Sequence, residues 1–224
     1  MRHDTVRPGP AARSGGGPLK DLPLDPAVWE KAWQAHLDED YELSLAEARR
    51  CLDEVDAERD QRLALVPEPG APTIQDAVVL CGRNLFQLDR FEDFEVLQAS
   101  AGRWGIVAEE SPCLDVIQLA FACKRGDYVR VVDEASRYIE AHRRSLPPVI
   151  AEFLYLRGLA YSSLGDPDRA REDAEAAYSV FRVLDNELES ARTANLLGVV
   201  SFRSADYERA VRWFHRALDL HTQL

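Results

Sequence analysis

The sequence lacks the features that mark membrane, secreted or disulfide-bonded proteins. No stretch of the 224 residues approaches the roughly 20 apolar residues that span a bilayer. The first 30 residues lack the apolar middle segment of a signal peptide. The four cysteines, Cys51, Cys81, Cys113 and Cys123, form no C-x-x-C pair, which is typical of thiols packed as small apolar side chains in a reducing compartment. We therefore predict a cytoplasmic protein without a membrane contact.

Motifs of catalysis and metal binding are lacking too. The chain contains no G-x-x-x-x-G-K-[ST], no G-x-S-x-G and no H-E-x-x-H. His215 and Asp219 lie four residues apart on one predicted helix, as half of a metal site would, but no third ligand accompanies them. An ordinary surface pair is the favoured interpretation. We predict no enzyme activity, no bound metal and no cofactor.

A surplus of basic charge is also lacking. The 27 Lys and Arg residues face 39 Asp and Glu residues, which leaves a net charge of −12. Such an acidic body argues against direct binding of nucleic acid. Residues 1–24 differ from the body: they are rich in Pro, Gly and Arg and show no apolar periodicity. We predict a disordered basic leader there, because the segment cannot bury enough apolar surface to offset its ordering entropy.

What the chain does contain is a recurring spacing of twelve residues between two positions that favour small side chains. Five units fit this spacing, and their paired positions are Ala32 and Ser44, Gly82 and Phe94, Leu119 and Val131, Gly158 and Ala170, and Gly198 and Ala210. The second members lie 50, 37, 39 and 40 residues apart along the chain. The spacing predicts a repeat domain over residues 25–224, with units at about 25–60, 74–103, 111–143, 148–184 and 188–222.

Each unit is predicted to be a pair of helices. In the fourth unit, apolar residues recur every three or four positions from Phe153 to Leu164, which is the pattern of one helical face. Gly165 can end that helix in a left-handed conformation. Asp166 then caps the next helix, and Pro167 takes its first position. A lone helix pair cannot bury both of its faces, so stacking on neighbours explains the repetition.

In each of the last two units, the first of the paired positions is a glycine within a predicted helix. Such a glycine costs about 0.5–1 kcal/mol relative to alanine and therefore needs a compensating role. We predict that Gly158 packs against Ala170, and Gly198 against Ala210, where the two helices of a hairpin cross closely.

The residues of the last two units resemble the tetratricopeptide repeat family. The pattern is carried by Leu154, Gly158, Tyr161, Ala170 and Ala177 in one unit and by Leu197, Gly198, Ala210, Phe214 and Ala217 in the next. The period near 40 is similar to the long-helix variants in kinesin light chains and bacterial peptide-sensing regulators. The resemblance implies an all-α solenoid of about five antiparallel helix pairs, wound as a right-handed superhelix.

The resemblance also implies a function and a site. In this family the first helices line a concave groove that binds peptides, and the stretch "ESARTANLLGVV" places an asparagine where relatives hold peptide backbone. The groove residues would be Trp29, Trp33, Arg83, Phe86, Lys124, Tyr155, Arg192, Asn195, Phe202 and Arg203. This aromatic and basic set suits a protein or peptide with apolar anchors and acidic groups. Alternatively, the aromatic residues are core between hairpins, and the polar ones are simply solvated.

The favoured function is therefore a non-enzymatic peptide-binding scaffold, such as an adaptor or the sensor part of a bacterial regulatory system. The alternative is a structural module that forms homo-oligomers. The last predicted helix has no polar capping helix behind it, so Leu218, Leu220 and Leu224 are predicted to be exposed. In that alternative the open end docks on another copy, and the groove is empty or holds the basic leader.

Overall fold

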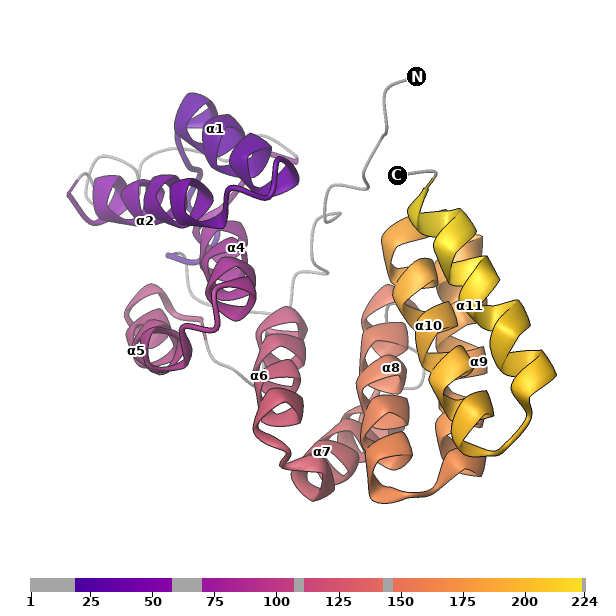
Figure 1. Cartoon of the computed structure of the whole chain (residues 1–224). Coiled ribbons are helices and arrows are strands. Elements are labelled where there is room, and N and C mark those ends of the chain that lie inside the picture. Colours follow the sequence, from indigo (N-terminus) through magenta and orange to yellow (C-terminus); the bar gives the residue numbers. More distant parts are fainter. Residues whose placement is uncertain (1–18, 58–69, 107–110, 143–146, 223–224) are drawn as a thin grey trace. The chain divides into compact units, whose positions relative to one another are not determined.

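The computed structural model describes residues 19–57, 70–106, 111–142 and 147–222. All regular elements in these ranges are helices, which confirms the all-α prediction (Figure 1). They are α1 (Pro26–Leu37), α2 (Tyr41–Ala57), α4 (Ile74–Gln87), α5 (Phe91–Ala101), the 3-10 helix η1 (Gly102–Trp104), α6 (Pro112–Arg125), α7 (Tyr128–Ala141), α8 (Pro147–Leu164), α9 (Pro167–Val183), α10 (Glu187–Arg203) and α11 (Tyr207–His221). The chain divides into two compact units between Ile117 and Gln118, within α6.

In the N-terminal unit, α2 packs against both α1 and α4. The Ser44 hydroxyl donates a hydrogen bond to the Ala32 carbonyl oxygen at 2.8 Å, so the first predicted position pair is in direct contact. The amide nitrogen of Asn84 on α4 donates to the same hydroxyl at 2.7 Å. Ser44 and Asn84 are fully buried. This polar chain satisfies groups that would otherwise be costly inside the core.

Residues 1–24 were predicted to be a disordered leader. Residues 1–18 lie outside the described residues, whereas residues 19–24 are described and differ from the prediction. Leu22 and Leu24 are buried, and Pro23 forms an isolated antiparallel bridge with Thr73. The Leu24 amide donates to the Pro72 carbonyl oxygen at 3.0 Å. Residues 19–24 are therefore part of the packed unit, because two leucines and a backbone partner offset their ordering cost.

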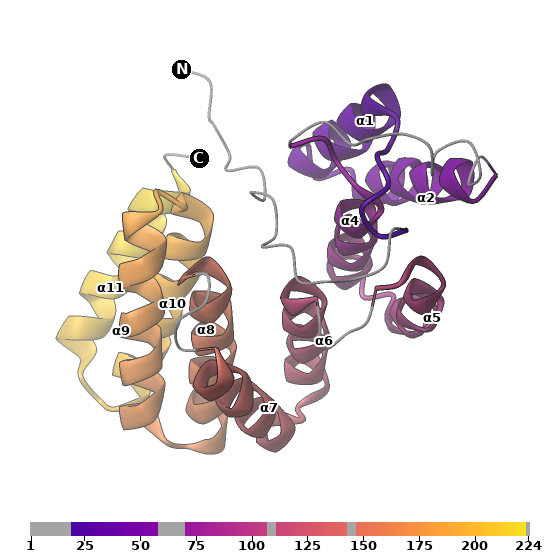
Figure 2. The same ribbon diagram turned by 180° about the vertical axis from the view of Figure 1, so that it is seen from behind.

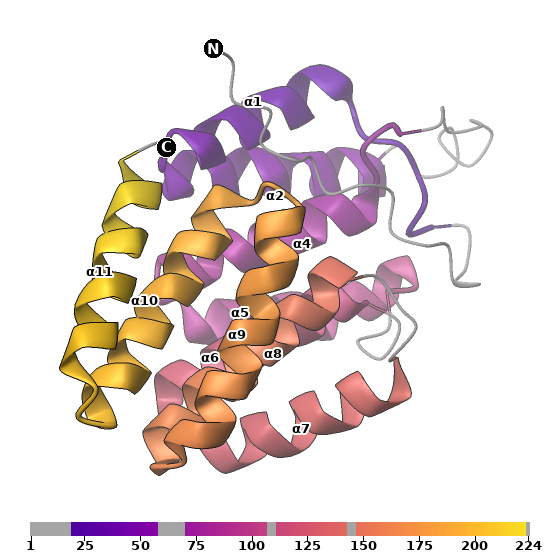
Figure 3. The ribbon, with the colours of Figure 1, turned by 90° about the vertical axis from the view of Figure 1, so that its right-hand side faces the viewer.

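In the C-terminal unit, α8 packs on α9 and α10 packs on α11, and α9 joins the two hairpins by packing on α10 (Figure 3). Figure 2 shows α7 beside α8, against which it also packs. Ala170 and Ala174 of α9 meet Leu196, Leu197 and Val200 of α10 in one buried cluster. Small residues on α9 thus let two hairpins approach and share a core.

Gly158 and Gly198 lie at close approaches between helices, and the nearest neighbour of Gly198 was not predicted. A Cβ on Gly158 would lie 3.2 Å from the Ala170 carbonyl oxygen, so this predicted contact is confirmed. A Cβ on Gly198 would lie 2.5 Å from the Phe214 ring. The space of the absent side chain is thus bordered most closely by an aromatic ring one helical turn beyond Ala210 on α11, which the sequence did not predict.

The turn between α8 and α9 has the predicted chemistry. Gly165 is left-handed with φ of 85°, and the Asp166 carboxylate accepts from the Arg169 amide at 3.1 Å. Pro167 begins the helix. In the last hairpin, Ala205 takes the equivalent left-handed position with φ of 61°, which is strained for a residue with a Cβ.

Two ion pairs recur at the same register of the repeat. Lys31 bonds Glu47, and Arg157 bonds Asp173, and each pair spans sixteen residues from the first helix of a hairpin to the second. The Arg157–Asp173 pair is bidentate, with two N–O distances of 2.7 Å. Arg157 also donates to the Ser136 hydroxyl of α7 at 3.0 Å, so one guanidinium joins three helices.

Candidate peptide-binding pocket

The C-terminal unit brings predicted groove residues of α8 and α10 together. The Arg192 guanidinium lies 5.2 Å from the centre of the Tyr155 ring. At the other end of the same two helices, Arg203 donates to the carbonyl oxygen of Ser162 and, at 3.2 Å, to its hydroxyl. The two first helices therefore present a shared face, as the repeat pattern predicts.

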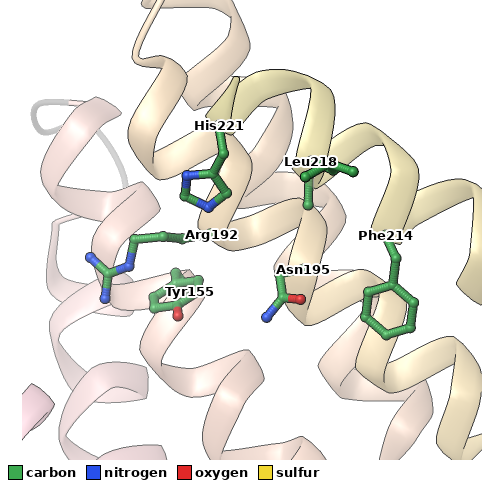
Figure 4. Close-up of a pocket in the computed structure, with 7 residues that line it drawn as sticks. Tyr155, Arg192, Asn195, Phe214, Leu218 and His221 are labelled. Atoms are coloured by element: carbon green, nitrogen blue, oxygen red, sulfur yellow. The ribbon is translucent and has the colours of Figure 1, made fainter. Parts of the chain in front are cut away.

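A pocket of about 430 Å³ opens on this face (Figure 4). Its lining is contributed by α8, α10 and α11 and consists of Tyr155, Arg192, Asn195, Phe214, Ala217, Leu218 and His221. In Figure 4, the Asn195 side chain lies between the rings of Tyr155 and Phe214. Asn195 is exposed, and its amide has no hydrogen-bond partner within the described part of the chain. An amide in this position is free to donate and accept at the same time.

Arg192, Glu189 and Tyr155 interact with one another and determine the charge at this side of the pocket. Arg192 pairs with Glu189 at 2.9 Å. Burial opposes the charge of Arg192, but Glu189 and Tyr155 outweigh it and raise the pKa of the guanidinium. Burial raises the pKa of the Tyr155 phenol, against the opposing influence of Arg192. The pocket thus presents a permanent cation, a neutral phenol and an uncharged amide.

Phe202, Arg203 and Lys124 are exposed but do not line this pocket. Phe202 is 59% exposed and lies edge-on to Tyr207, with ring centres 5.6 Å apart. Arg203 is engaged with Ser162, as described above. Three of the six groove residues predicted in this unit therefore converge at one pocket.

The four predicted groove residues of the N-terminal unit lie on α1 and α4. Trp29 is buried, and its ring stacks on half-buried Trp33 with centres 6.0 Å apart. Trp33 stacks in turn on His36 at 5.8 Å, and His36 hydrogen-bonds the Asn84 side chain at 2.7 Å. Arg83 and Phe86 are half-buried. The burial of Trp29 agrees with the alternative that it serves the core.

The His36 hydrogen bonds define which ring nitrogen carries the proton. Asn84 donates from its nitrogen to Ser44, so its oxygen faces His36 and accepts. The Nδ1 of His36 is therefore the donor. Burial and the charge of Arg83 lower the pKa of this imidazole, although the bond to Asn84 acts in the opposite direction.

Sequence reasoning missed the contribution of α11 to the pocket. Phe214, Leu218 and His221 were not predicted as site residues, because the family pattern assigns the groove to first helices. Their spacing of four and three residues, which places them on one helical face, was the available signal. The position of the Phe214 ring beside Gly198 is what brings this face to the pocket.

Leu218, Leu220 and Leu224 near the end of the sequence were predicted to be exposed, and the structure differs from this prediction at one of them. Leu218 is 58% exposed, as predicted, but Leu220 is buried, and Leu224 lies outside the described residues. Leu220 is buried because it lies on the same face of α11 as Ala217 and Ala210, which pack toward α10.

Three of the thiols, those of Cys51, Cys81 and Cys123, are buried and are poor nucleophiles. Burial raises the pKa of the Cys51 thiol to about 11 and of the Cys81 and Cys123 thiols to about 12. At neutral pH these side chains are protonated and pack as apolar groups. Among the described residues, no three His, Cys, Asp or Glu side chains gather as a metal site would require.

A comparison of the sequence with protein-family models adds to the evidence from the helix pairs, the small residues at their crossings and the caps of their turns. The tetratricopeptide repeat family model matches residues 149–223, which contain all but the first two residues of α8 and all of α9, α10 and α11. Residues 149–223 are tetratricopeptide repeats. A comparison with curated proteins finds no match to the chain.

Tetratricopeptide repeats are typically non-catalytic scaffolds for protein–protein interaction, and residues 149–223 have the helical-hairpin fold of such repeats. The pocket lies within the matched residues, on the face formed by the first helices and completed by α11. Within the described residues, none of the helices combines the length and the apolar character needed to cross a bilayer.

Proposed function

We propose that the pocket of α8, α10 and α11 binds a segment of a partner protein that carries an acidic group beside an apolar side chain. The observation that carries this proposal is the combination of a cation and a free amide with an exposed apolar wall. Arg192 and Asn195 supply the polar part, and Phe214 and Leu218 supply the wall.

The Asn195 amide suits peptide backbone. An extended segment presents alternating N–H and C=O groups, and a carboxamide can bond one of each. Because Asn195 is exposed and has no partner among the described residues, binding would not require breaking an existing bond. Tyr155 and Phe214 line the same pocket, so a segment bound to Asn195 would also contact their rings.

Arg192 suits a single carboxylate. Its guanidinium is held in place by Tyr155 and by Glu189, so little side-chain entropy is lost when it engages a ligand. Glu189 already neutralises part of its charge, which favours one acidic group over a polyanion. Phe214 and Leu218, 37% and 58% exposed, would then bury an adjacent apolar side chain at about 25 cal/mol per Å².

In a cell, this binding fits a cytoplasmic adaptor or the sensor part of a bacterial regulatory system. The partner is a protein, and the chain contributes recognition without chemistry. Exposed Phe202, Arg203 and Lys124 extend the set of groove residues beyond the pocket.

The proposal is tested by selecting peptides from a random display library against the purified chain and measuring their affinity by calorimetry. We expect selected peptides to share an Asp or Glu next to a Leu or Phe. The change Arg192→Gln with Asn195→Ala should weaken them by at least about tenfold, which is 1.4 kcal/mol. Arg169→Gln on α9, with an exposed guanidinium, is the matched control and should leave affinity unchanged.

Either of two results would count against the proposal: selected peptides without the acidic and apolar pair, or equal affinity for the double variant. Circular dichroism of each variant separates a lost contact from a lost fold.

A second candidate function is self-association through α11. Tyr207, Val211 and Leu218 are 60%, 54% and 58% exposed, and with Phe214 they form one apolar stripe along the helix. Sedimentation at increasing concentration tests this function, and Val211→Glu should abolish any dimer that uses the stripe. A wild-type chain that stays monomeric at high concentration would exclude it.

A further inference from the structure

A second pocket, on a different side of the C-terminal unit, is lined by a cluster of arginines and aromatic rings. It lies between α9 and α11, has a volume of about 390 Å³, and is lined by Tyr178, Arg209, Arg212, Trp213 and Arg216. None of these residues lines the pocket of α8, α10 and α11. The two pockets occupy different faces of α11.

The three arginines differ in how far they are already engaged. Arg209 donates to the Glu175 carboxylate at 2.6 Å, so its charge is paired. Arg212 lies 4.0 Å from Glu208, with 68% and 94% of the two side chains exposed, which is too far for a hydrogen bond. Arg212 is therefore essentially solvated.

Arg216 has an unusual partner. Its Nε donates to the Tyr178 hydroxyl at 3.1 Å, a neutral group on the neighbouring helix. Within the described residues, its two terminal nitrogens have no hydrogen-bond partner, although the side chain is half-buried. The bond to Tyr178 orients the guanidinium while its outer edge remains available for an anion.

The floor of the pocket is aromatic. Trp213 meets Tyr178 edge to face, with ring centres 5.2 Å apart, and both pack against the buried cluster shared by α9 and α10. A floor anchored in the core gives a ligand a rigid surface, and its exposed ring edges suit an apolar side chain.

The charge of the cluster decides between kinds of anionic partner. Glu175 pairs with Arg209, Glu208 lies near Arg212, and the charge of Asp219 acts on Arg216, so each arginine has one acidic neighbour. Of these neighbours, Glu175 accepts a hydrogen bond from its arginine, whereas Glu208 lies 4.0 Å from Arg212. The whole chain carries −12 and repels extended polyanions such as nucleic acid. The guanidinium edges of Arg212 and Arg216 that no carboxylate hydrogen-bonds, beside an aromatic floor, match one carboxylate followed by an apolar side chain.

We propose that the α9–α11 pocket is a second protein-docking site, which captures a single Asp or Glu side chain of a partner between Arg212 and Arg216 and packs an adjacent apolar side chain on Trp213. The chain then holds two partner segments on different faces of α11. This inference goes beyond the proposed function, because it uses separate residues and stands if the first pocket binds nothing.

The experiment observes the Trp213 indole N–H in ¹H–¹⁵N spectra of the full chain, assigned by its disappearance in Trp213→Phe. The probes are acetyl-Leu-Glu-Leu-amide, the matching acetyl-Leu-Gln-Leu-amide, the matching phosphoserine peptide, and inorganic phosphate. We expect a saturable shift of the Trp213 signal with the Glu peptide and a much weaker one with the Gln peptide.

Arginine variants locate the binding. Arg212→Gln together with Arg216→Gln should weaken the Glu peptide by roughly tenfold, since an exposed ion pair contributes up to about fivefold. Arg192→Gln, in the first pocket, should leave the titration unchanged, so failure of one site is distinguishable from failure of the other. Arg212→Gln alone, on a solvated side chain, keeps the test valid if the double variant does not fold.

The proposal is overturned by equal shifts with the Glu and Gln peptides, by no shift with either, or by an unchanged titration in the arginine variants. Tighter binding of the phosphoserine peptide or of inorganic phosphate would also overturn it, because the pocket would then be a phosphate site.

Discussion

Replacing Asp173 with alanine should destabilise the C-terminal unit through the arginine that it leaves behind. Asp173 and Arg157 are 7% and 19% exposed, and their two hydrogen bonds of 2.7 Å are the main link between the middle of α8 and α9 by charged groups. Hydrogen bonding to Asp173 outweighs the effect of burial and raises the pKa of Arg157. Without Asp173 the arginine still remains charged, because a guanidinium does not lose its proton in proteins.

The loss of stability depends on how far water can replace the hydrogen bonds that Arg157 loses in the variant. Breaking a fully buried ion pair costs about 3–5 kcal/mol, whereas an exposed pair contributes about 0–1 kcal/mol. Arg157 keeps its bond to Ser136 and reaches solvent with 19% of its side chain. We therefore expect Asp173→Ala to cost about 2–3 kcal/mol, between these two limits.

Urea unfolding followed by circular dichroism measures this cost, because urea does not screen ion pairs as guanidinium salts do. Glu172→Ala is the matched control: it removes an exposed carboxylate from the adjacent position of α9 and should change stability by less than about 0.5 kcal/mol. Adding Arg157→Met to Asp173→Ala should recover part of the loss, since no unpaired charge remains. A cost for Asp173→Ala equal to that of the control, or no recovery in the double variant, would refute this account of the pair.

Two further predictions concern pH and a strained turn. Because burial and Arg83 lower the pKa of His36 below the value of about 6.5 expected for the unfolded chain, the folded state binds fewer protons, and stability should fall as pH drops below 6.5. Unfolding at pH 7.5 and 5.5 should show a smaller loss for His36→Gln, and an identical loss would contradict the assignment. Ala205→Gly should raise the free energy of unfolding by about 1 kcal/mol, whereas Gly165→Ala at the equivalent left-handed position should lower it by at least as much. Chemical denaturation of both variants checks this, and the same sign of change in both would be incompatible with it.

Local chemistry along the chain was sufficient to predict the helix pairs. The spacing of small residues, the apolar face of α8 and the sequence Gly165–Asp166–Pro167 each act within a few residues of one another. A left-handed glycine, a side-chain cap and a proline at the first helical position have the same effect in most surroundings. Tyr155, Arg192 and Asn195 were predicted as groove residues from the resemblance to the tetratricopeptide repeat family, and the structure brings these three to one pocket.

Contacts between helices could not be predicted from these local sequence patterns. Nothing local to Gly198 indicates that a phenylalanine sixteen residues later fills the space of its missing side chain, or that α11 thereby completes the pocket. The ordering of residues 19–24 depends on Pro72 and Thr73, about fifty residues away. The orientation of the Arg216 guanidinium, with its two terminal nitrogens left without a hydrogen bond among the described residues, depends on the Tyr178 hydroxyl of α9. By itself, the amino-acid sequence determined that helical hairpins form and where each one turns, since those preferences are short-range. Which side chains meet across the hairpins was decided only in the folded unit, because packing selects partners by shape and distance rather than by position in the chain.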